Sequence, residues 1–301
     1  MNNRRYTSGA CWLVFALLAG LHSGRAQDST GVLVPTEAAL LWEISGQGLK
    51  APSHLFGTIH IIPKDSFFLP PATLRHLDAA ARLVLELPMD LDLSTMLASA
   101  RAMMLPGKQE IGVLLDTADY AYLRSFMADS MPAKVPMYER MKPLMTTQQI
   151  ATTYCIDGKT ESYELYFTRR AQKQKKPVSG LETFEEQLAM LDAIPLEEQA
   201  EGLMKTVRNM PEVCGGLREL VQVYRQQDLD ALVAMTTEDE DMAGHMTILL
   251  DDRNQRWIAQ IEELMRREQV FIAVGAGHLG GEAGVIALLR ARGYTLTPLY
   301  E

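Results

Sequence analysis

The chain has 301 residues, of which 47% are hydrophobic, and it carries a formal net charge of −9. This length and hydrophobic content are enough to bury a large core, so one large domain is expected, with two as the alternative. The negative charge repels nucleic acid and therefore excludes a nucleic-acid-binding role from the expected functions.

The first 26 residues have the pattern of a secretory signal peptide. Arg4 and Arg5 precede an apolar run from Leu13 to Leu21, and Ser23–Ala26 supplies a small-residue cleavage site. The run is too short to be read as a transmembrane helix, so no stable membrane span is expected after cleavage. A retained amphipathic anchor is the alternative. We therefore expect an exported protein, periplasmic or extracellular, whose mature charge is −12 once the three arginines of residues 1–26 are lost.

Two cysteines remain after the predicted cleavage, Cys155 and Cys214. An even pair in an exported protein favours a disulfide bond, which we predict here. Two buried free thiols are the alternative, because the sequence does not show whether the two side chains lie close together.

Hydrophobic patterns place strands near both ends of the chain. Residues 27–36 are expected to be a flexible lead-in and residues 37–301 to form one domain. The first two strands enclose the turn Gly46–Gly48 and read as a hairpin. The expected strands are Ala39–Ser45, Ser53–Phe56, Arg82–Leu87, Pro177–Leu181, Val270–Val274 and Tyr294–Leu299.

Helical periodicity dominates the middle of the chain, from about residue 91 to residue 268. Thr183 and Glu186 form a capping box that opens one helix. Further helices are expected at residues 73–81, 161–175, 192–207, 213–235, 246–268 and 282–292, the last one ending at Gly293 in a left-handed cap. The predicted fold class is α/β: a central mixed sheet built from N- and C-terminal strands, flanked by helices, with a largely helical middle insertion.

Two histidines stand at the ends of predicted strands in the same local pattern, G-x-x-H. One is His60, after the strand that breaks at Gly57, and the other is His278, after the strand that breaks at Gly275. Glycine lets the chain turn sharply at a strand end, so that a side chain such as that of the histidine faces a cleft. A buried histidine with no ligand role is the alternative at each position.

An acidic residue ends another predicted strand, which lies between the two histidines in the sequence. Glu86 closes an apolar run, and a buried acid costs several kcal/mol unless it is paired or ligated. Two imidazoles and a carboxylate are a common ligand set for a catalytic divalent metal. We therefore predict that His60, His278 and Glu86 hold one divalent ion, with Glu86 as third ligand or as general base; manganese, cobalt and zinc stay open.

Arg253 lies within an apolar stripe of its predicted helix, together with Leu250, Trp257 and Ile261. An inward guanidinium pairs with a carboxylate or a substrate anion, and we predict a pair with Glu86 or Glu182. An arginine whose stem packs while its head reaches solvent is the alternative. Glu86, Arg253 and Glu182 are the candidate catalytic residues.

Two other motifs are set aside. Gly275–Gly280 spells the dinucleotide fingerprint G-x-G-x-x-G, but the chain ends too soon afterwards for the strand and acid that this fingerprint requires. The acidic run Glu238–Asp241 lacks the spaced oxygens of a calcium loop, so it reads as a solvated loop.

The chain resembles the TraB/GumN family, which includes the TIKI metalloproteases. The resemblance rests on "LWEISGQGLKAPSHLFGTIH", "LVLELP", "GLETFEEQ", "DDRNQRWIAQI" and "VGAGHLGGEAGVIALLRARGY", and it spans about residues 40–300. It implies metal-dependent hydrolysis with His60, Glu86 and His278 at the motif positions, and a fold like that of the erythromycin esterases and the ChaN haem-binding proteins. The expected function is an exported metal-dependent hydrolase, a peptidase in the first place, acting on a peptide or small-molecule substrate. A non-catalytic peptide- or haem-binding protein on the same fold is the alternative.

Overall fold

A computed structural model describes residues 38–88, 93–237 and 247–300 of the chain. The predicted signal peptide, the lead-in and the acidic run Glu238–Asp241 lie outside the described residues. Among the residues that it does describe, no helix combines the length and the hydrophobicity needed to span a bilayer.

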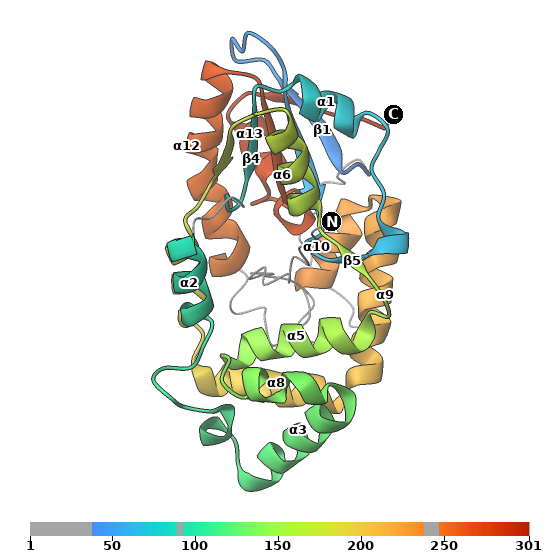
Figure 1. Cartoon of the computed structure of the whole chain (residues 1–301). Coiled ribbons are helices and arrows are strands. Elements are labelled where there is room, and N and C mark those ends of the chain that lie inside the picture. The colour runs from blue at the N-terminus through green and yellow to red at the C-terminus, as the bar shows by residue number, and fades with distance from the viewer. Residues whose placement is uncertain (1–37, 89–92, 238–246, 301) are drawn as a thin grey trace, which may run out of the picture.

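A six-stranded sheet forms the centre of one half of the molecule, in the order β6-β4-β7-β2-β1-β8 (Figure 1). β6, β4, β7 and β2 run parallel, whereas β1 is antiparallel to both β2 and β8. The sheet is therefore mixed, as predicted, and the predicted hairpin is its β1–β2 pair. The strands are β1 (Leu41–Ser45), β2 (Ser53–Thr58), β4 (Arg82–Leu85), β6 (Val178–Gly180), β7 (Val270–Gly275) and β8 (Thr295–Pro298).

The parallel strands read as apolar runs because both faces of the sheet are covered. All of β2 and nearly all of β7 is buried, as is typical of parallel strands between helices. Helix α6 (Tyr163–Lys173) packs against β4, and α13 (Val285–Ala291) packs against β8 and against α12 (Asp252–Arg267). α1 (Thr73–Ala79) lies beside α6 and β2.

Most of the chain between β4 and β7 is helical and builds a second hydrophobic core, below the sheet in Figure 1. Its helices are α2 (Leu93–Ala102), α3 (Thr117–Ser130), α4 (Val135–Tyr138), α5 (Pro143–Cys155), α7 (Phe184–Asp192), α8 (Leu196–Arg208) and α9 (Met210–Gln226). The next helix, α10 (Leu229–Thr237), packs instead into the sheet core through Leu229 and Leu232. α9 contributes to both cores: Met210 and Cys214 lie in the second one, and Leu217, Leu220 and Tyr224 in the sheet core.

The structure differs from the predicted elements at three places. The helix predicted over 213–235 is two helices, because Gln227 adopts the left-handed conformation with φ of 61° and Asp228 accepts a hydrogen bond from Ala231 N. The helix predicted over 246–268 begins with a π-helical turn, Thr247–Asp251, before α12. A two-stranded sheet of β3 (Ile62–Pro63) and β5 (Thr160–Glu161) was not predicted, since two-residue strands leave no periodicity to read.

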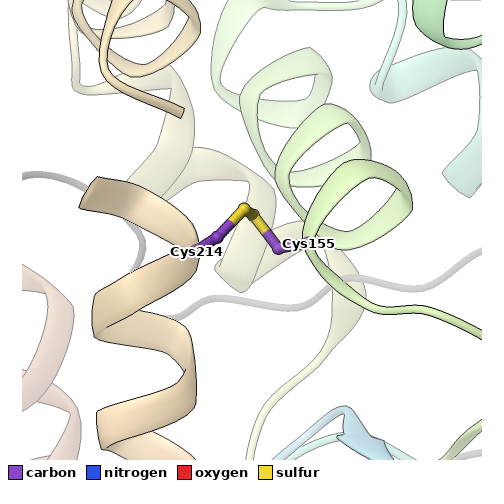
Figure 2. Close-up of a disulfide and its surroundings, with 2 residues drawn as sticks. All are labelled: Cys155 and Cys214. Atoms are coloured by element: carbon purple, nitrogen blue, oxygen red, sulfur yellow. A yellow bond between two sulfur atoms is a disulfide. The ribbon is translucent and has the colours of Figure 1, made fainter. Parts of the chain in front are cut away.

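The predicted disulfide between Cys155 and Cys214 is confirmed (Figure 2). It joins the last residue of α5 to the first half of α9, with the two Cα atoms 4.9 Å apart. The capping box at α7 is confirmed as well: Thr183 Oγ1 accepts from Glu186 N, and Glu186 Oε2 accepts from Thr183 N.

His54 on β2 makes the fold sensitive to acid. Its ring stacks on that of His76 at 3.8 Å, and neither ring nitrogen has a hydrogen-bond partner among the described residues. Burial, and then the neighbouring His76 and Arg75, lower the pKa of His54 to about 4. Because the folded pKa lies below the unfolded value near 6.5, this group contributes stability above pH 6.5 that is lost as the pH falls toward 4.

We expect His54→Leu to remove this acid sensitivity. Between pH 7 and pH 4 the free energy of unfolding of the variant should gain about 2 kcal/mol relative to the parent. Urea denaturation of both proteins at the two pH values measures this difference. A difference that does not change with pH would show that His54 is not the group responsible.

Candidate active site

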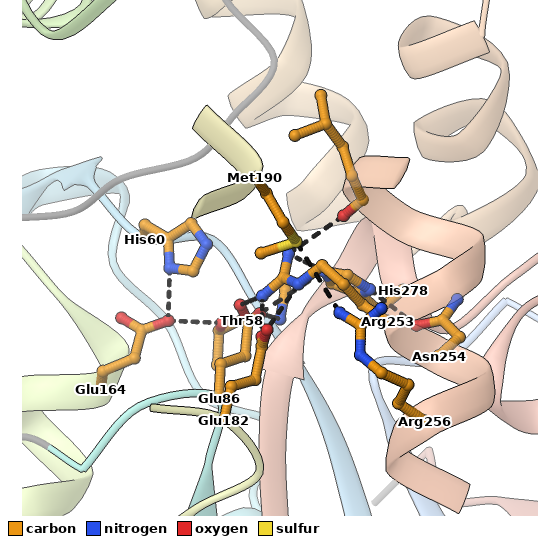
Figure 3. Close-up of polar contacts among 12 residues, drawn as sticks. Thr58, His60, Glu86, Glu164, Glu182, Met190, Arg253, Asn254, Arg256 and His278 are labelled. Carbon is orange, nitrogen blue, oxygen red and sulfur yellow. Dashed lines mark hydrogen bonds and ion pairs between the residues drawn. The ribbon is translucent and has the colours of Figure 1, made fainter. Parts of the chain in front are cut away.

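Four polar side chains follow the four parallel strands, and all four lie at the same edge of the sheet (Figure 3). In sheet order they are Glu182 after β6, Glu86 after β4, His278 after β7 and His60 after β2. The carboxyl ends of parallel strands are where α/β proteins place their sites, because the loops there converge.

Gly275 leaves room for this cluster at the end of β7. A Cβ at Gly275 would lie 3.3 Å from Glu86 Oε1, 3.6 Å from His278 Cδ2 and 3.6 Å from His60 Nε2. Because each histidine atom is 3.6 Å from the same point, the two atoms lie no more than twice that distance apart. The two G-x-x-H histidines therefore share one space, on adjacent parallel strands, as predicted. Gly275 has φ of −52°, so the glycine is needed for close approach and not for an unusual backbone conformation.

The His278 ring is held on three sides. Its Nδ1 donates to Asn254 Oδ1 at 2.7 Å, and Asn254 is oriented in turn by donating its amide to Ala283 O. Its Nε2 lies 3.0 Å from Arg253 Nη1, which has only protons to offer, so Nε2 is the acceptor and the ring is neutral. Trp257 packs against the ring at 4.5 Å between centroids.

The His60 ring is oriented by a carboxylate on α6. Glu164 Oε1 accepts from His60 Nδ1 at 2.9 Å and from Thr58 Oγ1 at 2.6 Å, and Glu164 Oε2 accepts from Ser162 Oγ at 2.8 Å. This carboxylate is held by hydroxyls on two elements, so it fixes the ring with Nε2 toward Gly275 and Glu86. The His60 side chain is 17% exposed, whereas that of His278 is 5% exposed, so the site opens on the His60 side.

Arg253 lies between the two acids, as predicted. Its Nη2 donates to Glu86 Oε2 at 2.6 Å, its Nε donates to Glu182 Oε1 at 2.9 Å, and its Nη1 also donates to Leu249 O. Nη2 contacts Glu182 Oε1 as well. The side chain is only 1% exposed, so the alternative of a head group in solvent is wrong.

Arg253 pairs with both carboxylates, but their surroundings shift the pKa values of the two acids in opposite directions. Burial raises the pKa of Glu86, but Arg253, His278 and His60 outweigh it and hold the pKa well below its usual range; the amide of Gly275, 2.7 Å from Oε1, adds to this. Burial raises the pKa of Glu182, and the pair with Arg253 does not fully offset it. Glu86 is thus the ionised acid of the pair, and Glu182 is the one that takes a proton first.

The two histidines also differ in charge. Burial lowers the pKa of His60, but Glu164 and then Glu86 outweigh it and raise the pKa to about 9. Burial and the adjacent Arg253 lower the pKa of His278 to about 3. Without a ligand, the site at neutral pH therefore holds a charged ring facing the opening and a neutral ring buried behind it.

The donor chemistry suits a divalent ion. Each histidine uses Nδ1 to donate to an oxygen acceptor, Glu164 or Asn254, which directs Nε2 to the shared space; this is the outer-shell arrangement of metal-binding histidines. Glu86 Oε1 lies 3.8 Å from His278 Nε2. Across the described ranges, however, no three His, Cys, Asp or Glu side chains already stand in a metal-binding arrangement. Arg253 contributes to this, because its Nη1 takes the lone pair of His278 Nε2.

Sequence reasoning missed two residues of this site, Glu164 and Asn254. Glu164 lies in the first turn of α6, where an acid is expected simply to favour a helix N-terminus. Asn254 did carry a signal in the sequence, because it stands four residues from both Leu250 and Ile258; the structure places it at 1% exposed on α12. His54 stacks on His76 and takes no part in the cluster.

The chain is similar to known proteins over most of its length. The profile of the TraB/PrgY/gumN family matches residues 40–298. Metalloprotease TIKI1 of Danio rerio is 23% identical over 94% of this chain and 68% of its own length. Metalloprotease TIKI2 of Danio rerio is 22% identical over 98% of this chain and 69% of its own length. Metalloprotease TIKI2 of Xenopus tropicalis is 23% identical over 81% of this chain and 57% of its own length. No solved structure matches the chain significantly.

Proposed function

Because the chain belongs to the TraB/PrgY/gumN family, we propose that it is an exported metal-dependent hydrolase that cleaves peptide bonds. His60, His278 and Glu86 would hold a divalent ion, with manganese, cobalt and zinc as the candidates. The observation that carries the proposal is that His60 Nε2, the His278 ring and Glu86 Oε1 all lie beside Gly275, with His278 Nε2 3.8 Å from Glu86 Oε1. The relatives named as metalloproteases support the reaction class.

The disulfide supports export. Cysteine pairs persist in oxidising compartments and are rare in the cytosol, so a bond between Cys155 and Cys214 fits a periplasmic or extracellular protein. Residues 1–26 would supply the signal for that export.

The side chains around the proposed metal each have a role in this proposal. A bound divalent ion would supply Lewis-acid chemistry, polarising the scissile carbonyl and acidifying water. Glu86 is ionised and able to accept a proton from water if it acts as a base instead of a ligand. Arg253 keeps a buried positive charge beside the site, where it stabilises negative charge that develops on the substrate oxygen. Glu182, whose pKa is raised, holds the far side of Arg253 and sets where the guanidinium lies.

The direct test is peptide hydrolysis by the purified protein, with and without chelator, followed by addition of each metal in turn. The proposal predicts hydrolysis that chelator stops and one divalent metal restores, and no hydrolysis by His60→Ala or His278→Ala. Haem absorbance that depends on both histidines, without turnover under any metal, would contradict it and favour a binding protein.

Glu164 should act as a positioning residue for His60. Glu164→Ala removes the acceptor of the His60 Nδ1 proton, so we expect divalent metal affinity to fall about 10- to 100-fold, as for other outer-shell partners. Glu164→Gln keeps a carbonyl acceptor and should lose less. Isothermal titration with zinc, manganese or cobalt measures this without turnover; equal affinity in all three proteins would show that Glu164 does not orient the ring.

A further inference from the structure

A second concave site lies away from the histidines, along α9. It is a groove of about 490 Å³ between α9 and the segment of β3. The apolar part of its lining includes Ile156, Leu217, Val221 and Pro63, and its polar part includes Arg218, Gln222, Arg225 and Gln226. We propose that this groove binds an extended acidic peptide segment, and that the segment belongs to the substrate of the proposed peptidase.

The two arginines are the charged members of the lining. No carboxylate lines the groove together with them, although the chain as a whole carries a charge of −9. In the described part of the chain, neither Arg218 nor Arg225 forms an ion pair with an acid, and both are exposed. Two unneutralised guanidinium groups beside an apolar floor favour a ligand that brings carboxylates, because such pairs are charge-assisted and directional.

The spacing of these arginines points to an extended backbone. Arg218 and Arg225 are seven residues apart on one helix, which corresponds to about 10 Å along its axis at 1.5 Å per residue. A polyproline II segment places residues i and i+3 on the same side about 9.3 Å apart. Two acids separated by two residues would therefore meet both guanidinium groups at once.

The remaining lining suits such a segment. Gln222 and Gln226 lie on the same α9 face, and their amides can donate to backbone carbonyls, which a polyproline II chain leaves free. Leu217, Val221 and Ile156 supply the apolar surface for the side chains between the acids. An anionic membrane surface is flat and therefore fits a groove less well than an extended peptide does.

The groove is adjacent to the candidate active site. Pro63 in its wall is three residues after His60, so at most about 10 Å of chain separates them. β3 pairs with β5, which lies directly before Ser162 and Glu164. A peptide held along α9 is thus close enough to continue into the His60 opening, which is why the proposal rests on the proposed function for the identity of the ligand.

Fluorescence anisotropy with labelled decapeptides tests the proposal without any hydrolysis. The probe contains Glu-Pro-Pro-Glu; the matched peptides contain Gln-Pro-Pro-Gln and, with the same composition as the probe, Pro-Glu-Glu-Pro. We expect the first to bind at least tenfold more tightly than the other two, and less tightly as salt is raised. Arg218→Gln/Arg225→Gln should lose about tenfold in affinity.

The matched control is Arg101→Gln/Arg292→Gln, which removes two exposed arginines outside the groove and should bind as the parent does. Equal binding of the three peptides, equal binding by the two double variants, or binding to phosphatidylserine vesicles in place of the peptide would overturn the proposal. His278→Ala should bind the probe normally. Loss of probe binding by His278→Ala would place the peptide in the histidine cleft instead. If the parent protein hydrolyses no peptide, the proposed function fails, but peptide binding in the groove can still be measured.

Discussion

Replacing Arg253 by leucine is expected to lower the free energy of unfolding by about 3 to 5 kcal/mol, the cost of breaking a buried ion pair from one side. The guanidinium is 1% exposed and donates to Glu86, Glu182 and the Leu249 carbonyl. Without it, Glu86 keeps a buried charge that loses its directly hydrogen-bonded cation and retains only the His60 ring as a charged neighbour. Thermal and urea denaturation measure the change.

The control for this prediction lies three residues further on the same helix. Arg256 is exposed, and its Nη2 contacts Met190 Sδ at 3.8 Å, so Arg256→Leu should change stability by less than about 1 kcal/mol. Combining Arg253→Leu with Glu86→Gln and Glu182→Gln should recover part of the loss, since no uncompensated charge is then buried. An Arg253→Leu protein as stable as the parent would show that the buried pair is not what holds the strand ends together.

Removing the disulfide is the second change with a large expected effect on stability. Cys155 and Cys214 are separated by 59 residues, and a loop of that size corresponds to about 4 kcal/mol in the chain-entropy account of cross-links. We expect Cys155→Ser/Cys214→Ser to lower the free energy of unfolding by about 3 kcal/mol, within the range measured for native disulfides. The bond also ties the end of α5 to α9, the helix that contributes to both cores.

Reduction of the parent protein provides the matched comparison. Parent protein treated with dithiothreitol should unfold at the same urea concentration as the double variant, while the oxidised parent unfolds later. If the oxidised parent and the variant unfold together, the bond is absent in solution or does not constrain the unfolded chain.

The sequence was sufficient to predict that the two histidines lie close together in the fold. His60 and His278 each end a G-x-x-H after an apolar run, and runs that are buried on both faces belong to parallel strands whose carboxyl ends share one edge. Arg253 was predictable for a similar reason, because a charge inside an apolar helical stripe requires a buried partner. Glu86 and Glu182 were its predicted partners, and both are confirmed.

The residues that orient the histidines were not predictable in the same way. Glu164 reaches His60 from a helix 104 positions later in the sequence, and nothing in the local pattern of α6 distinguishes it from an acid at any helix start. The break between α9 and α10 at Gln227 could not be predicted either. Gln227 adopts the left-handed conformation although it is not glycine, and nothing in the polar pair Gln226–Gln227 indicates this. Such features depend on tertiary contacts, which periodicity does not encode.

X-ray absorption at the metal edge of the loaded protein tests most directly whether His60 and His278 share one ion. If they do, we expect two imidazole ligands per metal at about 2.0 to 2.2 Å, together with oxygen ligands, and one imidazole fewer in His60→Ala. A spectrum with no imidazole ligand, or one that is unchanged in both His60→Ala and His278→Ala, would contradict the account.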